Sequence, residues 1–209
     1  MSRRKPVLVF DLDETLIYTS MDDRETIRSI CINMKLLSLI YRAKQVGCTI
    51  LLLTNNPNAV YTYRGTKGKF VDIACDELLI AYNAIGSSCK RGKVSSIFDS
   101  ILTAENDEER TFNVPNKYNY ASPVKSLTDV HHMLKGRPAG DIYFFDDLRT
   151  HMLCKQSTFI HISPPFGTGH DATHYSPIVK ALEALEAVER SDSRTRRQKR
   201  KLKESRHGM

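Results

Sequence analysis

Three short apolar runs in the sequence each stop at a polar residue. The run VLVF (7–10) precedes Asp11, TILLL (49–53) precedes Thr54, and IYFF (142–145) precedes Asp146. Short runs that are apolar throughout and rich in β-branched or aromatic residues are typical of parallel strands buried on both faces. The residues that follow neighbouring parallel strands meet at one edge of the sheet. If these strands are neighbours, we therefore expect the three polar side chains to lie close together.

Helical patterns lie between and after these runs. Apolar residues recur at helical spacing in three segments, 34–47, 122–136 and 176–190. The first ends at Gly47 and the second runs from about Ser126 to Gly136, residues suited to helix ends. Two further strands are predicted within 96–106 and 157–163. Alternating strands and helices predict an α/β fold in which helices cover both faces of a central parallel sheet.

Composition is that of an ordinary globular domain. The chain has 209 residues, of which 41% are hydrophobic and 26% are charged. It contains no apolar run long enough to cross a membrane and no signal-peptide pattern at its start. The five cysteines are scattered and lack CxxC spacing, so neither a zinc site nor a disulfide framework is expected. We expect an intracellular protein, cytoplasmic or nuclear, with no membrane association.

The net charge of +7 is concentrated at the end of the chain. Residues 190–209 contain nine Lys or Arg and two Asp or Glu, whereas residues 1–189 contain 22 of each kind. This division predicts a folded domain over 1–189 and a basic, disordered tail over 190–209. The tail is suited to nucleic acid, an acidic protein or a nuclear import receptor, and a purely solubilising role is the alternative.

Carboxylates at strand ends suit phosphoryl transfer. Oxygen ligands of this kind bind Mg²⁺, which offsets the repulsion between Asp11 and Asp13 and neutralises an incoming phosphate. One carboxylate can attack phosphorus to form an aspartyl-phosphate. A second can donate a proton to the leaving oxygen and later take one from water. A Thr hydroxyl and a Lys ammonium would complete the phosphate pocket.

Four motifs in chain order resemble those of the haloacid dehalogenase (HAD) superfamily of Mg²⁺-dependent phosphohydrolases. They are Asp11-Leu12-Asp13-Glu14-Thr15, Thr54 after ILLL, a Lys, and Asp146-Asp147 after IYFF, and the resemblance covers about residues 6–189. It implies a HAD-like Rossmannoid fold, with Asp11 as nucleophile and metal ligand. It implies that Asp13 is the general acid/base and also binds Mg²⁺ through its backbone carbonyl. It further implies that Thr54 binds the phosphate, that Asp146 binds the metal directly or through water, and that Asp147 supports it.

Two lysines are candidates for the third motif. Lys125 lies at the start of a predicted helix, 21 residues before Asp146. Lys117, in VPNKYNY, is the alternative. The helix-start position favours Lys125 as the phosphate-binding lysine.

The sequence DLDETLIYTS resembles one branch more closely. It is similar to the start of the phosphatases that act on the RNA polymerase II C-terminal domain and of the NLI-interacting-factor-like proteins. In that branch a short β flap follows, and TIRSICINM (26–34) alternates like a flap strand. The space between motifs leaves no room for a large cap domain. The resemblance therefore implies an open site and a bulky substrate, a phosphoprotein carrying phosphoserine or phosphothreonine.

Two alternatives stay open. The second motif reads Thr54-Asn55-Asn56, which is similar to the polynucleotide 3′-phosphatases, although Glu14 stands where that branch usually has Gly. With the basic tail as a tether, the substrate would then be a nucleic-acid end. The other alternative is a catalytically weak binding module, against which the intact set of motifs argues.

Basic residues between the second and third motifs are predicted to lie on loops, either as a rim for an acidic substrate or as solvated side chains. They are Lys67, Lys69, Lys90, Arg91 and Lys93. His131 and His132 fall within a predicted helix, and surface histidines are expected because no metal-ligand partner stands at the right spacing.

Overall fold

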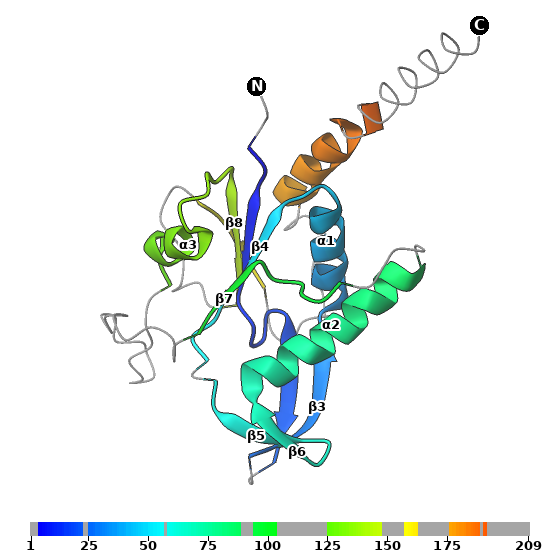
Figure 1. Ribbon diagram of the computed structural model, residues 1–209, viewed down its shortest axis with the longest axis vertical. Helices are drawn as coiled ribbons and strands as arrows, with labels where there is room; N and C mark the ends of the chain where they lie inside the picture. The colour runs from blue at the N-terminus through cyan, green and yellow to red at the C-terminus, as the bar shows by residue number, and fades with distance from the viewer. Residues whose placement is uncertain are drawn as a thin grey trace, which may run out of the picture.

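The centre of the protein is a five-stranded parallel sheet. The computed structural model describes residues 4–22, 25–56, 58–88, 94–103, 125–147, 157–162, 176–188 and 190–191. The strands lie in the order β7-β4-β1-β8-β9, and every neighbouring pair is parallel (Figure 1). Their bounds are β7 Ser100–Leu102, β4 Thr49–Leu53, β1 Val7–Phe10, β8 Ile142–Asp146 and β9 Ser157–His161. The predicted central parallel sheet is therefore confirmed.

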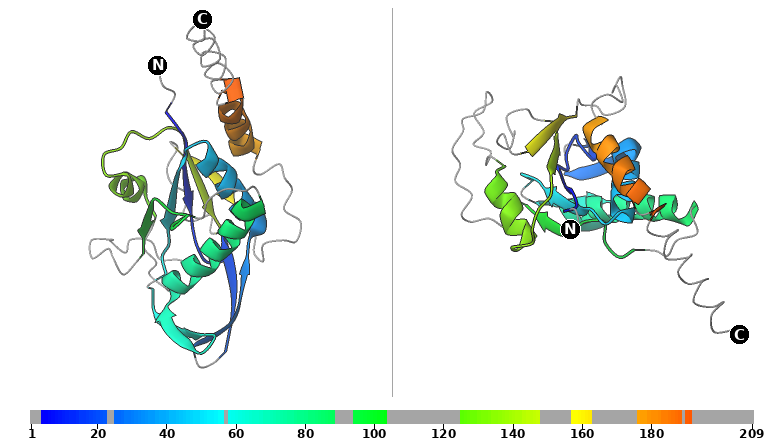
Figure 2. Two further views of the ribbon diagram at one scale, coloured as in Figure 1. Left: turned by 45° about the vertical axis from the view of Figure 1, so that its right-hand side comes forward. Right: turned by 90° about the horizontal axis from the view of Figure 1, so that it is seen from above.

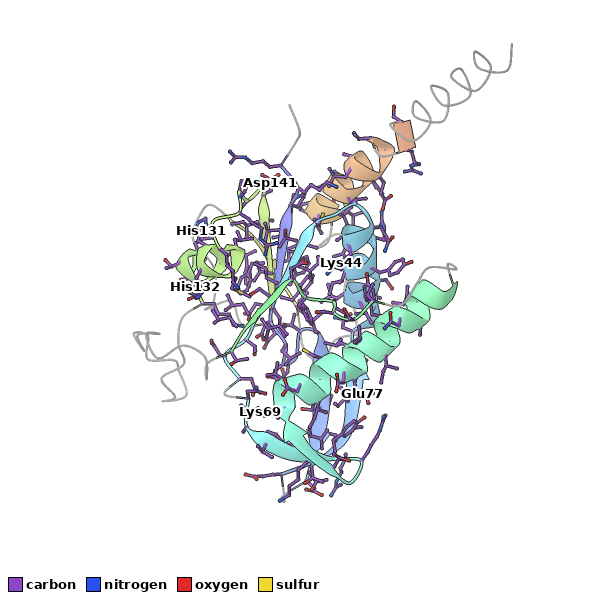
Figure 3. The ribbon with its side chains drawn as sticks, in the orientation of Figure 1. Lys44, Lys69, Glu77, His131, His132 and Asp141 are labelled. Carbon is purple, nitrogen blue, oxygen red and sulfur yellow. The ribbon has the colours of Figure 1, made fainter. Side chains whose placement is uncertain are left out.

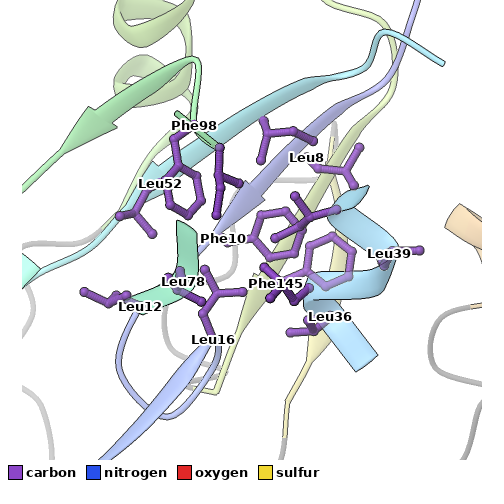
Figure 4. Packing of buried hydrophobic residues seen from close by; sticks show 14 of the residues in the cluster. Leu8, Phe10, Leu12, Leu16, Leu36, Leu39, Leu52, Leu78, Phe98 and Phe145 are labelled. Carbon is purple, nitrogen blue, oxygen red and sulfur yellow. The ribbon is translucent and has the colours of Figure 1, made fainter. Parts of the chain in front are cut away.

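The three apolar runs form the three middle strands. Val7 of β1 is in register with Thr49 of β4 and with Ile142 of β8. All four residues of β1 and all five of β8 are buried, as expected for strands covered on both faces. Phe10 and Phe145, which are register partners, stack with ring centroids 4.4 Å apart (Figure 4).

Helices cover both faces of this sheet, as predicted. On one face, α1 (Met34–Gln45), α2 (Phe70–Ser88) and the helical residues 176–188 pack on a cluster that includes Phe10 and Phe145. On the other face, α3 (Leu127–Leu134) packs on a cluster that includes Val9 and Phe144 (Figure 2). The alternation of side chains along each strand divides the apolar residues between the two clusters.

The ends of α1 and α3 follow the sequence signals. Asn33 caps the start of α1 by accepting a hydrogen bond from Leu36 N–H, and Gly47 follows its end at φ 73°. Ser126 caps α3 in a capping box, and α3 is followed by Lys135 and Gly136, which are both left-handed. A left-handed residue after a helix satisfies the last carbonyl groups, which is why glycine is common there.

A second, four-stranded sheet forms the flap. Its order is β2-β3-β5-β6, with bounds β2 Ile17–Met21, β3 Thr26–Ile32, β5 Val60–Tyr63 and β6 Thr66–Lys69. The predicted flap strand within 26–34 is therefore present. The sequence analysis was wrong to place Lys67 and Lys69 on loops, since both lie on β6, which pairs with β5 around a turn at Arg64 and Gly65. Lys90, Arg91 and Lys93 lie outside the described residues.

Helix α2 has no counterpart in the sequence prediction. It has 19 residues and buries Phe70, Val71, Ala74, Leu78 and Tyr82. This helix joins the flap to α1, because it contacts α1 as well as β3, β5 and β6. Within the described ranges no large cap domain is inserted, and no helix has the length and apolarity needed to cross a bilayer. Residues 192–209 lie outside the description, so the tail stays a prediction.

Candidate active site

The carboxyl ends of β1, β4 and β8 bring the polar residues of three motifs to one edge. Backbone hydrogen bonds hold the chain in place just beyond the strands. Asp11 N–H donates to Phe145 O at 2.9 Å, and Thr54 N–H donates to Leu102 O at 3.0 Å. Asp146 is the last residue of β8, and its carbonyl accepts from Ile162 N–H at 3.0 Å. The side chains of Asp11, Thr54 and Asp146 are all buried at this edge.

Lys125 joins two of these carboxylates. Its Nζ lies 2.6 Å from Asp11 Oδ1 and 2.7 Å from Asp146 Oδ2, and the lysine side chain is 2% exposed. It stands immediately before the Ser126 cap of α3, so the start of that helix sets its direction. The structure thus places Lys125, the preferred lysine of the third motif, among the carboxylates. Lys117 lies outside the described residues.

The turn after β1 positions Asp13. Leu16 N–H and Ile17 N–H both donate to Leu12 O, at 2.9 and 3.1 Å, which closes a compact turn. Glu14 occupies its left-handed position, with φ 54°. Asn33 Nδ2 donates to Thr15 O at 3.1 Å and ties the turn to the start of α1. Asp13 is held two residues beyond Asp11 and is partly buried.

Asn56 is a residue of the site that the sequence analysis did not single out. Its Nδ2 donates to Asp13 Oδ2 at 3.0 Å, and its backbone N–H donates to Thr54 Oγ1 at 3.1 Å. It therefore connects the first and second motifs. Its place two residues after Thr54, within the polar Thr-Asn-Asn run, was the only available signal in the sequence.

An acidic cluster could hold a metal ion. Carboxylate oxygens of Asp11, Asp146 and Asp147 all lie within 4.8 Å of one another. Three hard oxygen donors in a small space suit a divalent cation such as Mg²⁺, which keeps some water ligands. The carboxylates repel one another, so the site needs positive charge, and the Lys125 ammonium supplies part of it. The donor set of this site therefore fits the ion that the resemblance implies.

Burial and mutual repulsion raise the pKa values of the carboxyl groups. Burial and the Asp11 charge raise the pKa of Asp13 to about 6 and that of Asp147 to about 7. Burial also raises the pKa of Asp11, which the nearby Lys125 ammonium lowers only in part. For Lys125, burial lowers the pKa, but Asp11 and Asp146 outweigh it, so the pKa is raised and the ammonium stays charged. Groups with perturbed pKa values at a sheet edge are typical of reactive sites.

The flap presents a basic strand on its outer face. Register pairs Thr62 with Lys67 and Val60 with Lys69, so these four side chains share one face. Tyr61 projects to the other face, where its ring meets Phe70 with centroids 5.5 Å apart. A cavity of about 270 Å³ lies beside β5 and is lined by Glu25, Val60, Tyr61, Thr62 and Lys67.

The histidines of α3 lie apart from this edge. His131 and His132 are exposed on the helix surface, as predicted, and Figure 3 shows them on the side opposite α2. Asp141, also exposed, lies at the amino end of β8, at the far end of the strand from Asp146.

Comparisons with known proteins identify the fold. No family model matches the sequence, and no curated protein matches it. A solved structure from Mesorhizobium loti, described as a HAD-like phosphatase, superposes with a TM-score of 0.50 over 88% of each chain, at 16% identity. The fold is HAD-like.

Two other solved structures resemble the fold of this protein more loosely. They are chains of the Pnkp1/Rnl/Hen1 complex and of the Pnkp1/Rnl/Hen1 RNA repair complex, each 16% identical. Their TM-scores are 0.40 and 0.42, over 80% and 79% of this chain. This chain spans only 47% and 44% of theirs. The HAD-like fold confirms the predicted fold class, while the residue roles that the resemblance implies stay predictions.

Proposed function

We propose that the protein is a Mg²⁺-dependent phosphatase that hydrolyses a phosphomonoester through an aspartyl-phosphate on Asp11. The observation that carries this proposal is the buried Lys125 ammonium between Asp11 and Asp146 at the carboxyl edge of the sheet. A buried cation with two carboxylates is costly to maintain as a purely structural device. The same arrangement suits a site that receives a phosphate dianion and an ion with it.

The proposed reaction has two steps. In the first, an Asp11 carboxylate oxygen attacks phosphorus while the bond to the leaving oxygen breaks, and Asp13 donates a proton to that oxygen. In the second, water attacks the aspartyl-phosphate and Asp13 takes the proton, which releases phosphate and restores Asp11. Thr54 Oγ1 and Lys125 Nζ bind phosphoryl oxygens. Asp11, Asp146, Asp147 and the Asp13 carbonyl would hold Mg²⁺, which would supply positive charge beside the phosphoryl oxygens.

A phosphoprotein is the proposed substrate. No large cap domain stands over the carboxyl edge in the part of the chain that the structure describes, so a bulky substrate can approach. The flap is a small sheet of four strands, of which β2 and β3 follow the first motif and β5 and β6 follow the second. An open site with a β flap is what the resemblance to the NLI-interacting-factor-like branch implies for phosphoserine or phosphothreonine.

A nucleic-acid end is the second candidate. Lys67 and Lys69 are exposed on the outer face of the flap, and phosphate backbones bind to such cations. The basic tail would add to this attraction. A catalytically weak binding module is the third candidate, and it predicts that ligand binding does not depend on Asp11.

The reaction is tested with p-nitrophenyl phosphate and Mg²⁺. We expect turnover by the full chain, its loss on chelation with EDTA, and a fall of at least about 10³-fold for Asp11→Asn, since a missing nucleophile removes the covalent route. Asp141→Asn is the matched control, because it makes the same substitution on an exposed residue at the other end of the molecule's sheet. Equal activity in wild type and Asp11→Asn would rule out the proposed mechanism.

The substrate is tested by comparing a phosphoserine peptide with a 3′-phosphorylated oligonucleotide. A higher kcat/KM for the peptide supports the proposal. A higher kcat/KM for the oligonucleotide, reduced when Lys199, Arg200 and Lys201 of the tail are changed to Gln, supports the second candidate. If neither substrate is hydrolysed and one of them binds wild type and Asp11→Asn equally well, the protein is a binding module.

A further inference from the structure

Asn56 has both ends of its side-chain amide fixed. Its Nδ2 donates to Asp13 Oδ2 at 3.0 Å, and its Oδ1 accepts from the backbone N–H of Asn58 at 2.8 Å. One partner is an acceptor and the other is a donor, so the amide has one orientation that satisfies both. The backbone N–H of Asn56 donates to Thr54 Oγ1 at 3.1 Å and fixes the position of the residue as a whole.

Asn58 anchors this arrangement to α2. It has a left-handed backbone, with φ 58°, and its Oδ1 accepts from Val71 N–H at 2.8 Å. Phe70 N–H in turn donates to Ala59 O at 2.9 Å, so the start of α2 holds the loop from two sides. Because Phe70 and Val71 are both buried, the chain from Asp13 through Asn56 and Asn58 ends on a rigid element.

We propose that Asn56 is a positioning residue for proton transfer by Asp13. This inference rests on the proposed phosphatase reaction. An amide N–H can only donate, so Asp13 Oδ2 must act as the acceptor in this bond. Accepting this bond makes Oδ2 the less basic oxygen, which favours a proton on Oδ1, and the fixed amide determines where Oδ1 points.

The role of Asn56 is specific to one part of the reaction. As the Asp11 oxygen–phosphorus bond forms and the phosphorus–leaving oxygen bond breaks, the proton moves from Asp13 Oδ1 to the leaving oxygen. In the second step a proton from the attacking water returns to Asp13 Oδ1, and Asn56 ends unchanged. A leaving group that is stable as an anion needs no proton, so its departure does not depend on the position of Oδ1.

The test compares two leaving groups in the full chain with Mg²⁺. Phenyl phosphate has a poor leaving group and 2,4-dinitrophenyl phosphate a good one, and kcat/KM reports only steps up to the first irreversible one. Since general acid catalysis contributes about 10²–10⁴-fold, we expect Asn56→Ala to lower kcat/KM about 10-fold for phenyl phosphate. For dinitrophenyl phosphate we expect a change of less than about 2-fold. The ratio of the two values does not depend on how much of a preparation is folded.

Two variants sharpen the comparison. Asn58→Gly keeps the left-handed backbone and the N–H but removes the anchor to Val71. It should lower the ratio of kcat/KM for phenyl phosphate to kcat/KM for dinitrophenyl phosphate, by a smaller factor than Asn56→Ala does. Asn83→Ala is the matched control. Asn83 also uses both amide atoms, with Val94 N–H at 3.0 Å and Val94 O at 3.3 Å, but it is a half-buried residue farther along α2. Its ratio should equal that of wild type.

The outcomes separate the inference from the proposed function. A selective loss for phenyl phosphate in Asn56→Ala supports the inference. An equal loss for both substrates, or no loss for either, shows that Asn56 is a structural residue and overturns it. If wild type hydrolyses neither substrate, or if Asp11→Asn hydrolyses both as fast as wild type, the proposed function itself is wrong.

Discussion

Lys125 is a buried cation on which two buried carboxylates depend. Its ammonium lies 2.6 Å from Asp11 and 2.7 Å from Asp146, and Asp146 is fully buried. When one partner of a buried ion pair is removed, the other is left with a charge that neither water nor protein compensates. The lysine therefore stabilises the fold as well as the proposed phosphate site.

Replacement of Lys125 by Met should lower the free energy of unfolding by about 3 kcal/mol in metal-free buffer at pH 7.5. Met keeps most of the side-chain volume, so the loss reports the charge. Urea unfolding followed by circular dichroism measures it. Lys35→Met, on the exposed side of α1, is the matched control and should stay within about 0.5 kcal/mol of wild type. An equal result for the two variants would contradict this account of Lys125.

Addition of Mg²⁺ should raise Tm more at pH 8 than at pH 5.5. The pKa values of Asp13 and Asp147 rise from 3.8 to about 6 and about 7 on folding, so the folded protein binds more protons. Metal-free stability therefore falls as pH rises from about 4 through 7. A metal needs the deprotonated carboxylates and removes their repulsion, so its effect grows as they ionise.

Differential scanning fluorimetry with and without Mg²⁺ measures this dependence. Asp147→Asn should lose most of the Mg²⁺-induced shift, whereas Asp141→Asn should keep it. A shift that is independent of pH, or that survives in Asp147→Asn, would show that the metal binds elsewhere.

For individual residues, the sequence predicts most of the candidate site but not all of it. Asp11, Thr54 and Asp146 follow apolar strands, and the fold needs only to make those strands neighbours for the side chains to meet. Lys125 is signalled by its place before a helix cap. Asn56 is not predictable in this way, because its contact with Asp13 depends on the left-handed turn at Asn58 and on the start of α2.

Among the elements, α3 connects helix capping with the site. Ser126 Oγ accepts from Asp129 N–H at 3.3 Å, and Asp129 Oδ2 accepts from Ser126 N–H at 2.7 Å. Lys125 is the residue immediately before this capping box. The cap therefore fixes both the first turn of α3 and the point from which the lysine reaches the carboxylates.

Ser126→Ala should lower the free energy of unfolding by about 1 kcal/mol, the usual cost of a lost N-cap. It should also raise KM for p-nitrophenyl phosphate, because Lys125, the proposed phosphate-binding lysine, is less firmly placed. Urea unfolding and steady-state kinetics measure the two effects. Ser38→Ala removes an exposed mid-helix hydroxyl that donates to Met34 O, and neither quantity should change. A Ser126→Ala variant that matches Ser38→Ala in both would contradict this role for the cap.

The helices also show where the pattern of apolar residues does not predict an element. The predictions for α1 and α3 rest on an apolar stripe and a terminal glycine. Helix α2 contains three charged residues, Asp72, Asp76 and Glu77, and its apolar residues are spread around the axis. It packs on α1 and on the flap strands together, so a single apolar stripe does not describe it. Strand β6, with the sequence TKGK, is polar enough to resemble a loop, and its antiparallel pairing with β5 is what makes it a strand.

On the scale of the whole molecule, the flap lies at the end opposite the N-terminus (Figure 1). Its outer face carries Lys67 and Lys69, and β5 begins six residues after Thr54. The helical residues 176–188 lie at the other end of the view. A macromolecular substrate at the carboxyl edge would therefore meet the flap and not the last helix.

Lys67→Glu combined with Lys69→Glu should lower kcat/KM for a phosphorylated macromolecule by about 30-fold, since two repulsive contacts of about 1 kcal/mol each add up to about 2 kcal/mol. The value for p-nitrophenyl phosphate should stay unchanged, because that molecule is too small to reach β6. Lys180→Glu, an exposed site on the last helix, is the control and should affect neither substrate. Parallel assays at low and high salt measure the effect. Equal losses for both substrates would show that β6 does not contact the macromolecule.

The central sheet has a consequence for how the chain is made. Val7 pairs with Thr49 on one side and with Ile142 on the other, a separation of 135 residues. At a synthesis rate of about 5–20 residues per second, β1 waits roughly 7 to 27 s for its second neighbour. During that time a strand of four apolar residues has one edge without its final partner. Asp11, the proposed nucleophile that follows β1, thus depends on a strand made 135 residues later, and nascent chains released before β8 is complete should be substrates for chaperones.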